Sequence, residues 1–295
     1  MLVIIALSFF IMRAAPGGPF SSEKKLPPQI MENIEKKYHL NDPLWVQFSD
    51  YLLGLLRGDL GPSFKSKDFT VGQMIGDSLP KSMQLGTISL VLALGAGLMA
   101  GIISALKKNT WGDYASMSVA IVGISVPLFV IGPILQQIFG LNLQVLPIAG
   151  WVGDGKWGYL TLILPAITLA LPTFAYIARL SRASILEVLR TDYVRTARAK
   201  GLSYPVVIWK HVLKGALLPV ISYLGPAYAT IITGSVVVEK IFAVPGLGRH
   251  FVLSALNRDY TLIMGTVIVY SLILVIMNFI VDVVYSFLDP RVSYK

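Results

Sequence analysis

The sequence predicts an all-α membrane protein with six transmembrane helices and a small external helical segment after the first span. Apolar residues make up 55% of the 295 residues and charged residues only 14%, and the mean hydropathy is +0.68. Soluble domains are far more polar. Several stretches also lack charged residues over the roughly 20 positions that a helix needs to cross a bilayer. The basic excess, 25 Lys and Arg against 16 Asp and Glu, lies between these stretches. We therefore expect a lipid bilayer and no nucleic acid as partner.

The first predicted span, residues 1–15, is short. Residues 1–12 are apolar throughout and Arg13 follows them. Either residues upstream of this stretch are missing from the sequence, so that the span is truncated, or Arg13 snorkels and the helix continues past it. A cleaved signal peptide is a third interpretation, which the poor cleavage site at Ala14-Ala15-Pro16 disfavours.

An external segment, residues 16–81, follows the first span. Asp42-Pro43 is an N-cap and first-turn signal for a helix, and the next apolar residues recur at helical spacing as far as Gly58. These residues are Leu44, Trp45, Phe48, Leu52, Leu55 and Leu56. The pattern predicts a short amphipathic helix whose apolar stripe packs against the rest of the protein, in preference to contacting a partner directly.

Five longer apolar stretches complete the predicted spans. These spans cover residues 82–106, 114–139, 157–182, 215–238 and 260–288. The second of them stays free of charge as far as Gly153, which leaves room for a non-helical outer segment. Gly97 and Gly101 form a GxxxG pair that permits close contact between helices.

The Lys and Arg residues in the loops orient the spans, because cytoplasmic loops carry the excess of these residues. One set of loops and span ends holds Lys107, Lys108, Arg179, Arg182, Arg190, Arg195, Arg198, Lys200, Lys210, Lys214, Arg291 and Lys295. The alternate set holds only Lys156, Lys240, Arg249 and Arg258. We therefore place the first set, and both termini, in the cytoplasm.

The cytoplasmic loop 187–214 joins the fourth and fifth spans. Its sequence indicates a short basic helix, a break at Gly201, and a second short helix. A rigid hairpin of this kind, with the small residues Thr196, Ala197 and Ala199 on one side, can insert into a groove on another protein. On composition alone, a loop lying on anionic headgroups is the favoured alternative.

The sequence contains no recognisable catalytic constellation. Residues 150–156 have the spacing of a phosphate-binding loop, but Trp157 follows them in place of the hydroxyl residue that binds magnesium. His39, His211 and His250 are dispersed over loops and lack metal-ligand spacing. The chain has no cysteine, which excludes disulfides, thiolate metal sites and cysteine nucleophiles. We expect no enzymatic activity, cofactor or metal in this chain.

Three polar residues are candidates for interhelical contacts within the membrane. Asn278 and Asp282 share one face of the last span with Tyr285, close to its cytoplasmic end. Hydrogen bonding between helices or at the interface is therefore favoured over substrate contact. Glu239, at the outer end of the fifth span, has the same two interpretations.

The segment from Arg195 to Gly201, with His211 ten residues after the glycine, resembles the peptide/nickel variant of the EAA loop. That loop is found in the permease subunits of bacterial ABC importers. Further matches of the same family, in the same order, extend over nearly the whole chain. They are residues 13–17, 58–64, 245–248, 257–260 and 289–291, together with Asn278, Asp282 and Tyr285. The outer residues 38–43 and 61–65 are most similar to oligopeptide permeases.

The resemblance implies a type I ABC importer permease fold in the bacterial inner membrane, forming half of a peptide pathway. It also implies a second homologous permease, an external peptide-binding protein, and two cytoplasmic ATPase subunits that hold ATP and magnesium. The ATPase-coupling loop would comprise Arg195, Thr196, Ala197, Arg198, Ala199, Lys200 and Gly201. Dipeptides, glutathione or nickel are alternative cargoes for the same fold. An intramembrane enzyme or an assembly scaffold is a more remote reading.

Two departures from the family pattern limit what the resemblance implies. The general motif has Glu-Ala-Ala where this chain has Arg195-Thr196-Ala197, so an ion pair made by that glutamate cannot be transferred. The basic N-terminal segment that is usual in the family is also absent, so the family pattern does not define where the first span begins.

Overall fold

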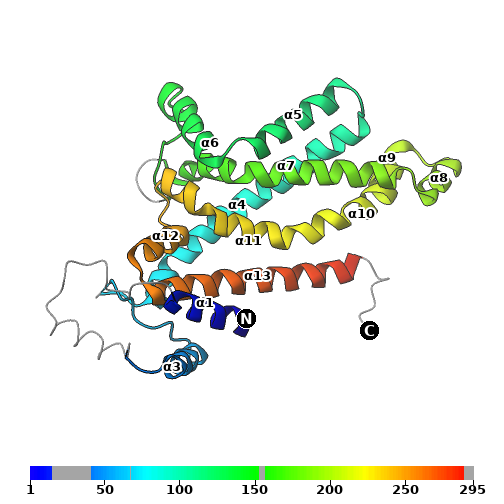
Figure 1. Cartoon of the computed structure of the whole chain (residues 1–295). Helices are drawn as coiled ribbons and strands as arrows, with labels where there is room; N and C mark the ends of the chain where they lie inside the picture. The colour runs from blue at the N-terminus through cyan, green and yellow to red at the C-terminus, as the bar shows by residue number, and fades with distance from the viewer. Residues whose placement is uncertain (15–40, 67, 153–156, 289–295) are drawn as a thin grey trace. The chain divides into compact units, whose positions relative to one another are not determined.

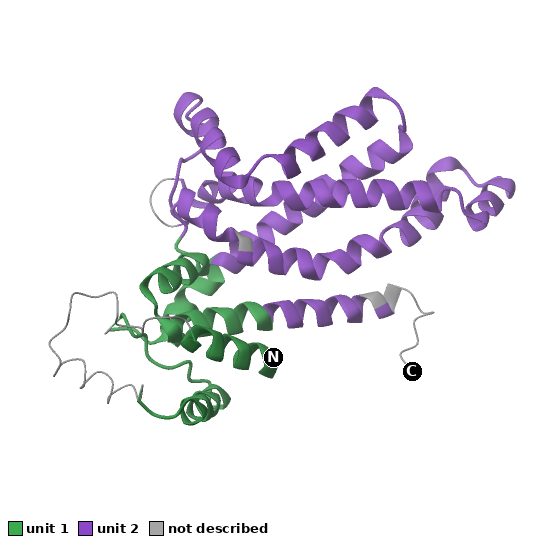
Figure 2. Ribbon diagram, in the orientation of Figure 1, with its two compact units in different colours: residues 1–81, 245–272 green, residues 82–244, 273–295 purple. Residues whose placement is uncertain are grey.

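The computed structural model describes residues 1–14, 41–66, 68–152 and 157–288. Regular structure in these ranges is helical, apart from an isolated antiparallel bridge between Pro62 and Thr70. The all-helical prediction is therefore confirmed. The chain forms two compact units, one of residues 1–81 and 245–272 and the other of residues 82–244 and 273–295 (Figure 2). Helices α4 (Val71–Leu106) and α13 (Tyr260–Leu288) each run from one unit into the other.

The first unit contains α1 (Leu2–Ala14), α3 (Leu44–Leu56), α12 (Leu247–Asn257) and the beginnings of α4 and α13 (Figure 1). Aromatic packing joins α1 to α3. The buried ring of Phe9 lies 5.1 Å from that of Phe48, edge to face. Arg13 stacks over Phe9 with its guanidinium 3.6 Å from the ring centroid, and it donates a 2.9 Å hydrogen bond to Gln47.

Helix α3 differs from the sequence prediction at its start and in its packing. Its N-cap is Pro43, with no capping side chain, so Asp42 is not the cap. Its end is set by Gly58, whose φ of +77° suits a residue without a Cβ. Half of the predicted apolar stripe is exposed, including Trp45 at 71% and Leu56 at 84%, and the other half, including Phe48, is partly buried. The contact with α1 through Phe9 therefore covers only part of the apolar face of α3.

The second unit is built around α7 (Ile163–Val188), which packs against α5 (Trp111–Ser125) and α11 (Leu218–Ile241). Helix α6 (Leu128–Leu135) and the 3-10 helix η2 (Gly158–Leu162) also contact α7, and the π-helix η1 (Gln136–Asn142) packs on α6. The predicted GxxxG pair of α4 contacts α7 closely. A Cβ on Gly101 would lie 2.7 Å from the carbonyl oxygen of Ala178.

The helices of the described chain support between three and five membrane spans. Three are long and apolar enough alone, and two bent pairs each pass the same test together. The 111° bend between α5 and α6 falls at Val126-Pro127, because proline holds Val126 in an extended conformation and lacks an N–H. The second bend, of 48°, falls at Leu217. Six spans therefore stay a prediction.

Helix α4 also changes one predicted boundary. It begins at Val71, so the end of the segment predicted as external, residues 16–81, is continuous with the helix that contains the span 82–106. Residues 15–40 and 289–295, which carry some of the family matches, lie outside the described residues.

Candidate functional site

The loop of residues 187–214, predicted to be cytoplasmic, folds into the helical hairpin that its sequence indicates. Helix α8 (Asp192–Ala199) begins after Thr191, whose backbone is extended. The second arm consists of α9 (Tyr204–Val206), the π-helix η3 (Val207–Val212) and α10 (Leu213–Ala216). Gly201 joins the two arms with a φ of +78°, a conformation that L side chains rarely adopt. The N–H of Gly201 donates a 2.9 Å hydrogen bond to the carbonyl of Arg198, which closes the end of α8.

Two side chains anchor α8 to the body of the second unit. Val194 and Ala197, three residues apart on one face of the helix, are buried at 0% and 5% exposure. They belong to an apolar cluster that includes Ile185 of α7, Ala105 of α4, and Val207, Ile208, Val212, Leu213 and Ala216 of the second arm. The hairpin is therefore packed directly onto the helices that it joins.

The remaining predicted coupling residues are exposed. They are Arg195, Thr196, Arg198, Ala199, Lys200 and Gly201. The structure separates Ala197 from Thr196 and Ala199, which sequence analysis placed on one side, because Ala197 faces inward with Val194. Arg195 forms a 3.3 Å ion pair with Asp192, and both side chains are mostly in solvent. The exposed face of the hairpin therefore carries cationic side chains.

Glu239 lies in a buried polar contact between two helices. Its side chain is 1% exposed and accepts 2.6 Å hydrogen bonds from Ser82 of α4 and Ser235 of α11. These bonds satisfy a carboxyl group that is costly to bury alone. Glu239 therefore links α4 to α11.

Asn278 and Asp282 are instead exposed on α13. Asn278 approaches α11 at Gly225, where an added Cβ would meet the Asn278 side-chain oxygen at 2.9 Å. The backbone carbonyl of Asp282 accepts a hydrogen bond from Ser286 at 2.9 Å. The structure does not gather the three predicted polar residues into one cluster, since the hydrogen bonds of Glu239 go to serines.

A buried ion pair that sequence analysis missed ties α5 to α7. The carboxylate of Asp113, 3% exposed, accepts bonds of 2.9 and 2.8 Å from Arg182, and a further bond from Ser104. The backbone N–H of Asn109 also donates to it at 2.9 Å. In the sequence pattern, Arg182 stands out only as topology-setting charge. An acidic residue in the first turn of a helix, where the dipole favours it, was the available signal.

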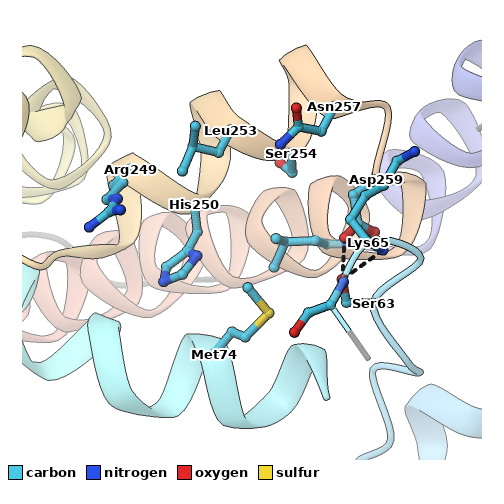
Figure 3. A pocket seen from close by; sticks show the side chains of 11 residues that line it. Ser63, Lys65, Met74, Arg249, His250, Leu253, Ser254, Asn257 and Asp259 are labelled. Carbon is cyan, nitrogen blue, oxygen red and sulfur yellow. Dashed lines mark hydrogen bonds between the residues drawn. The ribbon is translucent and has the colours of Figure 1, made fainter. Parts of the chain in front are cut away.

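The structure also joins two of the family-matching segments within the first unit. Asp259 caps α13, because one of its oxygens accepts the N–H of Leu262 at 3.3 Å. The N–H of Phe64 donates to the same oxygen at 3.2 Å, and the other oxygen accepts a hydrogen bond from the hydroxyl of Ser63 (Figure 3). The segments 58–64 and 257–260 therefore form one connection.

Comparison with known proteins decides the family. A family model described as a binding-protein-dependent transport system inner membrane component matches residues 97–294. The oligopeptide transport system permease protein OppB of Salmonella typhimurium is 48% identical over 294 residues, which cover 100% of this chain and 95% of that protein. The chain belongs to this family of inner-membrane transport components. The dipeptide transport system permease protein DppB of Bacillus subtilis is 46% identical, covering 99% of this chain and 94% of that protein.

Solved structures show the same fold for this inner-membrane transport component. A chain of the methionine ABC transporter MetNI in an inward-facing conformation has a TM-score of 0.61 at 14% identity, covering 73% of this chain and 96% of that one. A chain of an amino acid ABC transporter has a TM-score of 0.52 at 17% identity, covering 74% and 94%. The predicted ABC permease fold is therefore confirmed at the level of architecture.

Membership in this family of transport components makes the chain a membrane component of a transport system and agrees with its apolar helices. In the described part of the chain, no three His, Asp or Glu residues come together as a metal site would require. Residues 153–156, part of the segment with phosphate-loop spacing, lie outside the described residues.

Proposed function

We propose that this chain is one transmembrane subunit of an ATP-driven peptide importer, with oligopeptides as its main cargo. The observation that carries the proposal is the 48% identity to the Salmonella oligopeptide permease over the whole chain. The subunit forms half of the translocation pathway, and a second permease of similar fold forms the other half. An external peptide-binding protein delivers the cargo.

The proposed topology has six spans with both termini in the cytoplasm. The three long helices, the bent pair of α5 and α6, and α11 supply five spans, and α1 supplies the first. In this arrangement residues 187–214 hang on the cytoplasmic side, and the distribution of Lys and Arg supports it.

ATP hydrolysis, in the proposal, takes place in two cytoplasmic ATPase subunits that hold ATP and magnesium. The exposed face of Arg195–Gly201 lies in a groove of one ATPase and moves with it. Val194 and Ala197 pass this motion to α7 and α10, because both are packed in the same apolar cluster as those helices. A tightly packed contact transmits the displacement of one helix to the next, since protein interiors are close-packed and do not deform continuously.

Substitution of Gly201 tests this coupling role. Proline cannot adopt the φ of +78° and should misplace α8, whereas asparagine tolerates the left-handed region. In complexes reconstituted with the partner subunits, we expect Gly201→Pro to assemble but to lose peptide-stimulated ATPase activity and uptake. Gly201→Asn should retain most of both. Normal uptake by an assembled Gly201→Pro complex would rule out the coupling role.

Dipeptides are the second candidate cargo, because the Bacillus dipeptide permease is nearly as similar, at 46% identity. The cognate external binding protein decides between the two. If it binds peptides of three or more residues and not dipeptides, oligopeptides are the cargo, and the reverse preference assigns dipeptides.

A further inference from the structure

A pocket of about 470 Å³ opens in the first unit between α12, the start of α4, the start of α13 and the segment after Pro62 (Figure 3). Three of its lining side chains are basic or can become so, namely Lys65, Arg249 and His250. Met74 and Leu262 contribute apolar walls. The pocket therefore combines cationic and apolar surface.

The carboxylate at this pocket is committed to structural hydrogen bonds. Asp259 accepts from the hydroxyl of Ser63 and from Thr261 at 3.0 Å, in addition to the backbone N–H groups of Phe64 and Leu262. Arg249, in contrast, makes no hydrogen bond or ion pair with any residue that the structure describes. Its positive charge is thus not neutralised within the described protein.

The beginning of α12 adds further positive potential. Arg249 and His250 lie in the first turn of the helix, where the backbone dipole is positive, and this turn contains no acidic residue. Burial, followed by the charges of Arg249 and Lys81, lowers the pKa of His250. The positive charge of Arg249 at the positive end of the helix dipole is unfavourable, and a bound anion would offset it and would favour protonation of His250.

The position of the pocket along the chain indicates which kind of molecule would supply the anionic group. Lys81, close enough to His250 to affect it, immediately precedes the charge-free stretch 82–106 of α4. Basic residues at the polar end of a span lie at the depth of the phosphate headgroups. On α12, Leu253 and Leu256 are exposed by 39% and 72%. They offer contact for hydrocarbon beside the charged pocket.

We propose that this pocket binds the headgroup phosphate of an anionic phospholipid, from the leaflet that meets this end of α4 and α13. Arg249 and His250 contact the phosphate, and the exposed leucines of α12 contact the acyl chains. The proposal goes beyond peptide transport and does not rest on it.

Native mass spectrometry of the purified full chain tests this site with phosphatidylglycerol, and with phosphatidylcholine of the same acyl chains as the neutral reference. Loss of one basic group near a headgroup weakens binding by about 1 kcal/mol, or roughly fivefold. We expect Arg249→Ala to lower the affinity for phosphatidylglycerol by about this factor and to leave phosphatidylcholine binding unchanged. Arg249→Lys should retain binding, because it keeps the charge.

Arg57→Ala is the matched control, since Arg57 is an exposed basic residue of the same unit that does not line the pocket. Equal losses in Arg249→Ala and Arg57→Ala would overturn the proposal, as would equal affinity for the two lipids. Release of the bound lipid by a peptide with a free C-terminal carboxylate, and not by its amide, would assign the pocket to peptide instead. Thermal unfolding of each variant checks that it is folded, and none of these measurements depends on transport.

Discussion

Two ion pairs of this protein differ in how far they are buried. Asp113 pairs with Arg182 through two hydrogen bonds, while Asp192 pairs with Arg195 at the surface. The side chain of Asp113 is 4% exposed and that of Asp192 is 95% exposed. Water screens both partners of the second pair but reaches only the Arg182 side of the first, where that side chain is 27% exposed. The two pairs therefore differ in what their removal costs.

Replacement of Asp113 by alanine should destabilise the protein by about 3 kcal/mol, because it leaves Arg182 without its buried counter-charge. Asp192→Ala is the control and should cost less than about 1 kcal/mol. Thermal or denaturant unfolding in detergent measures both. Removing Arg182 as well should recover part of the loss. Equal effects of the two aspartate variants would show that the buried pair has no special role.

Helix packing in the second unit depends on small residues at contact points. A Cβ at Gly101 would meet the Ser181 hydroxyl oxygen at 2.1 Å as well as the carbonyl of Ala178. A Cβ at Gly225 of α11 would lie 2.9 Å from the side-chain oxygen of Asn278 and 3.1 Å from the carbonyl oxygen of Met277, both on α13. In a membrane, where no hydrophobic effect drives helices together, such close approach contributes much of the attraction.

Gly101→Ala should therefore destabilise the contact between α4 and α7, by about 1 to 3 kcal/mol for an overpacked position. Gly95 lies on the same helix and has open space around its Cβ position, so Gly95→Ala should be close to neutral. The unfolding temperatures of both variants in the same detergent provide the measurement. A larger loss for Gly95→Ala than for Gly101→Ala would contradict the packing argument.

The orientation of the spans in the membrane is a property of the whole molecule. The bent pair of α5 and α6 must count as a single span if the hairpin, predicted to be cytoplasmic, and the segment predicted to be external are to lie on opposite sides. The positive-inside distribution predicts that they do. A further property makes the orientation easy to measure, because the chain contains no cysteine.

Single-cysteine variants should reveal the two sides. In intact cells, a membrane-impermeant maleimide should label Ser49→Cys, on exposed α3, and not Ser203→Cys, in the hairpin. After the membrane is permeabilised, both variants should react. Labelling of Ser203→Cys in intact cells would show that the chain has the opposite orientation. The hairpin would then be out of reach of a cytoplasmic ATPase.

The sequence alone determined the properties that add up along the chain. The helical membrane class follows from hydropathy, and the hairpin on either side of Gly201 follows from helix-forming residues around a glycine. The family resemblance likewise rests on short motifs in order. Each of these depends on neighbours in sequence, which is why inspection of the residues was sufficient to find them.

Tertiary structure alone decided which distant residues meet. Arg182 and Asp113 are 69 positions apart, and Ser63 and Asp259 are 196 apart. The inward turn of Ala197 and the exposure of Asp282 were also decided by packing. These pairings depend on how helices approach one another in space, and a hydrogen bond forms only when that approach brings donor and acceptor within about 3 Å.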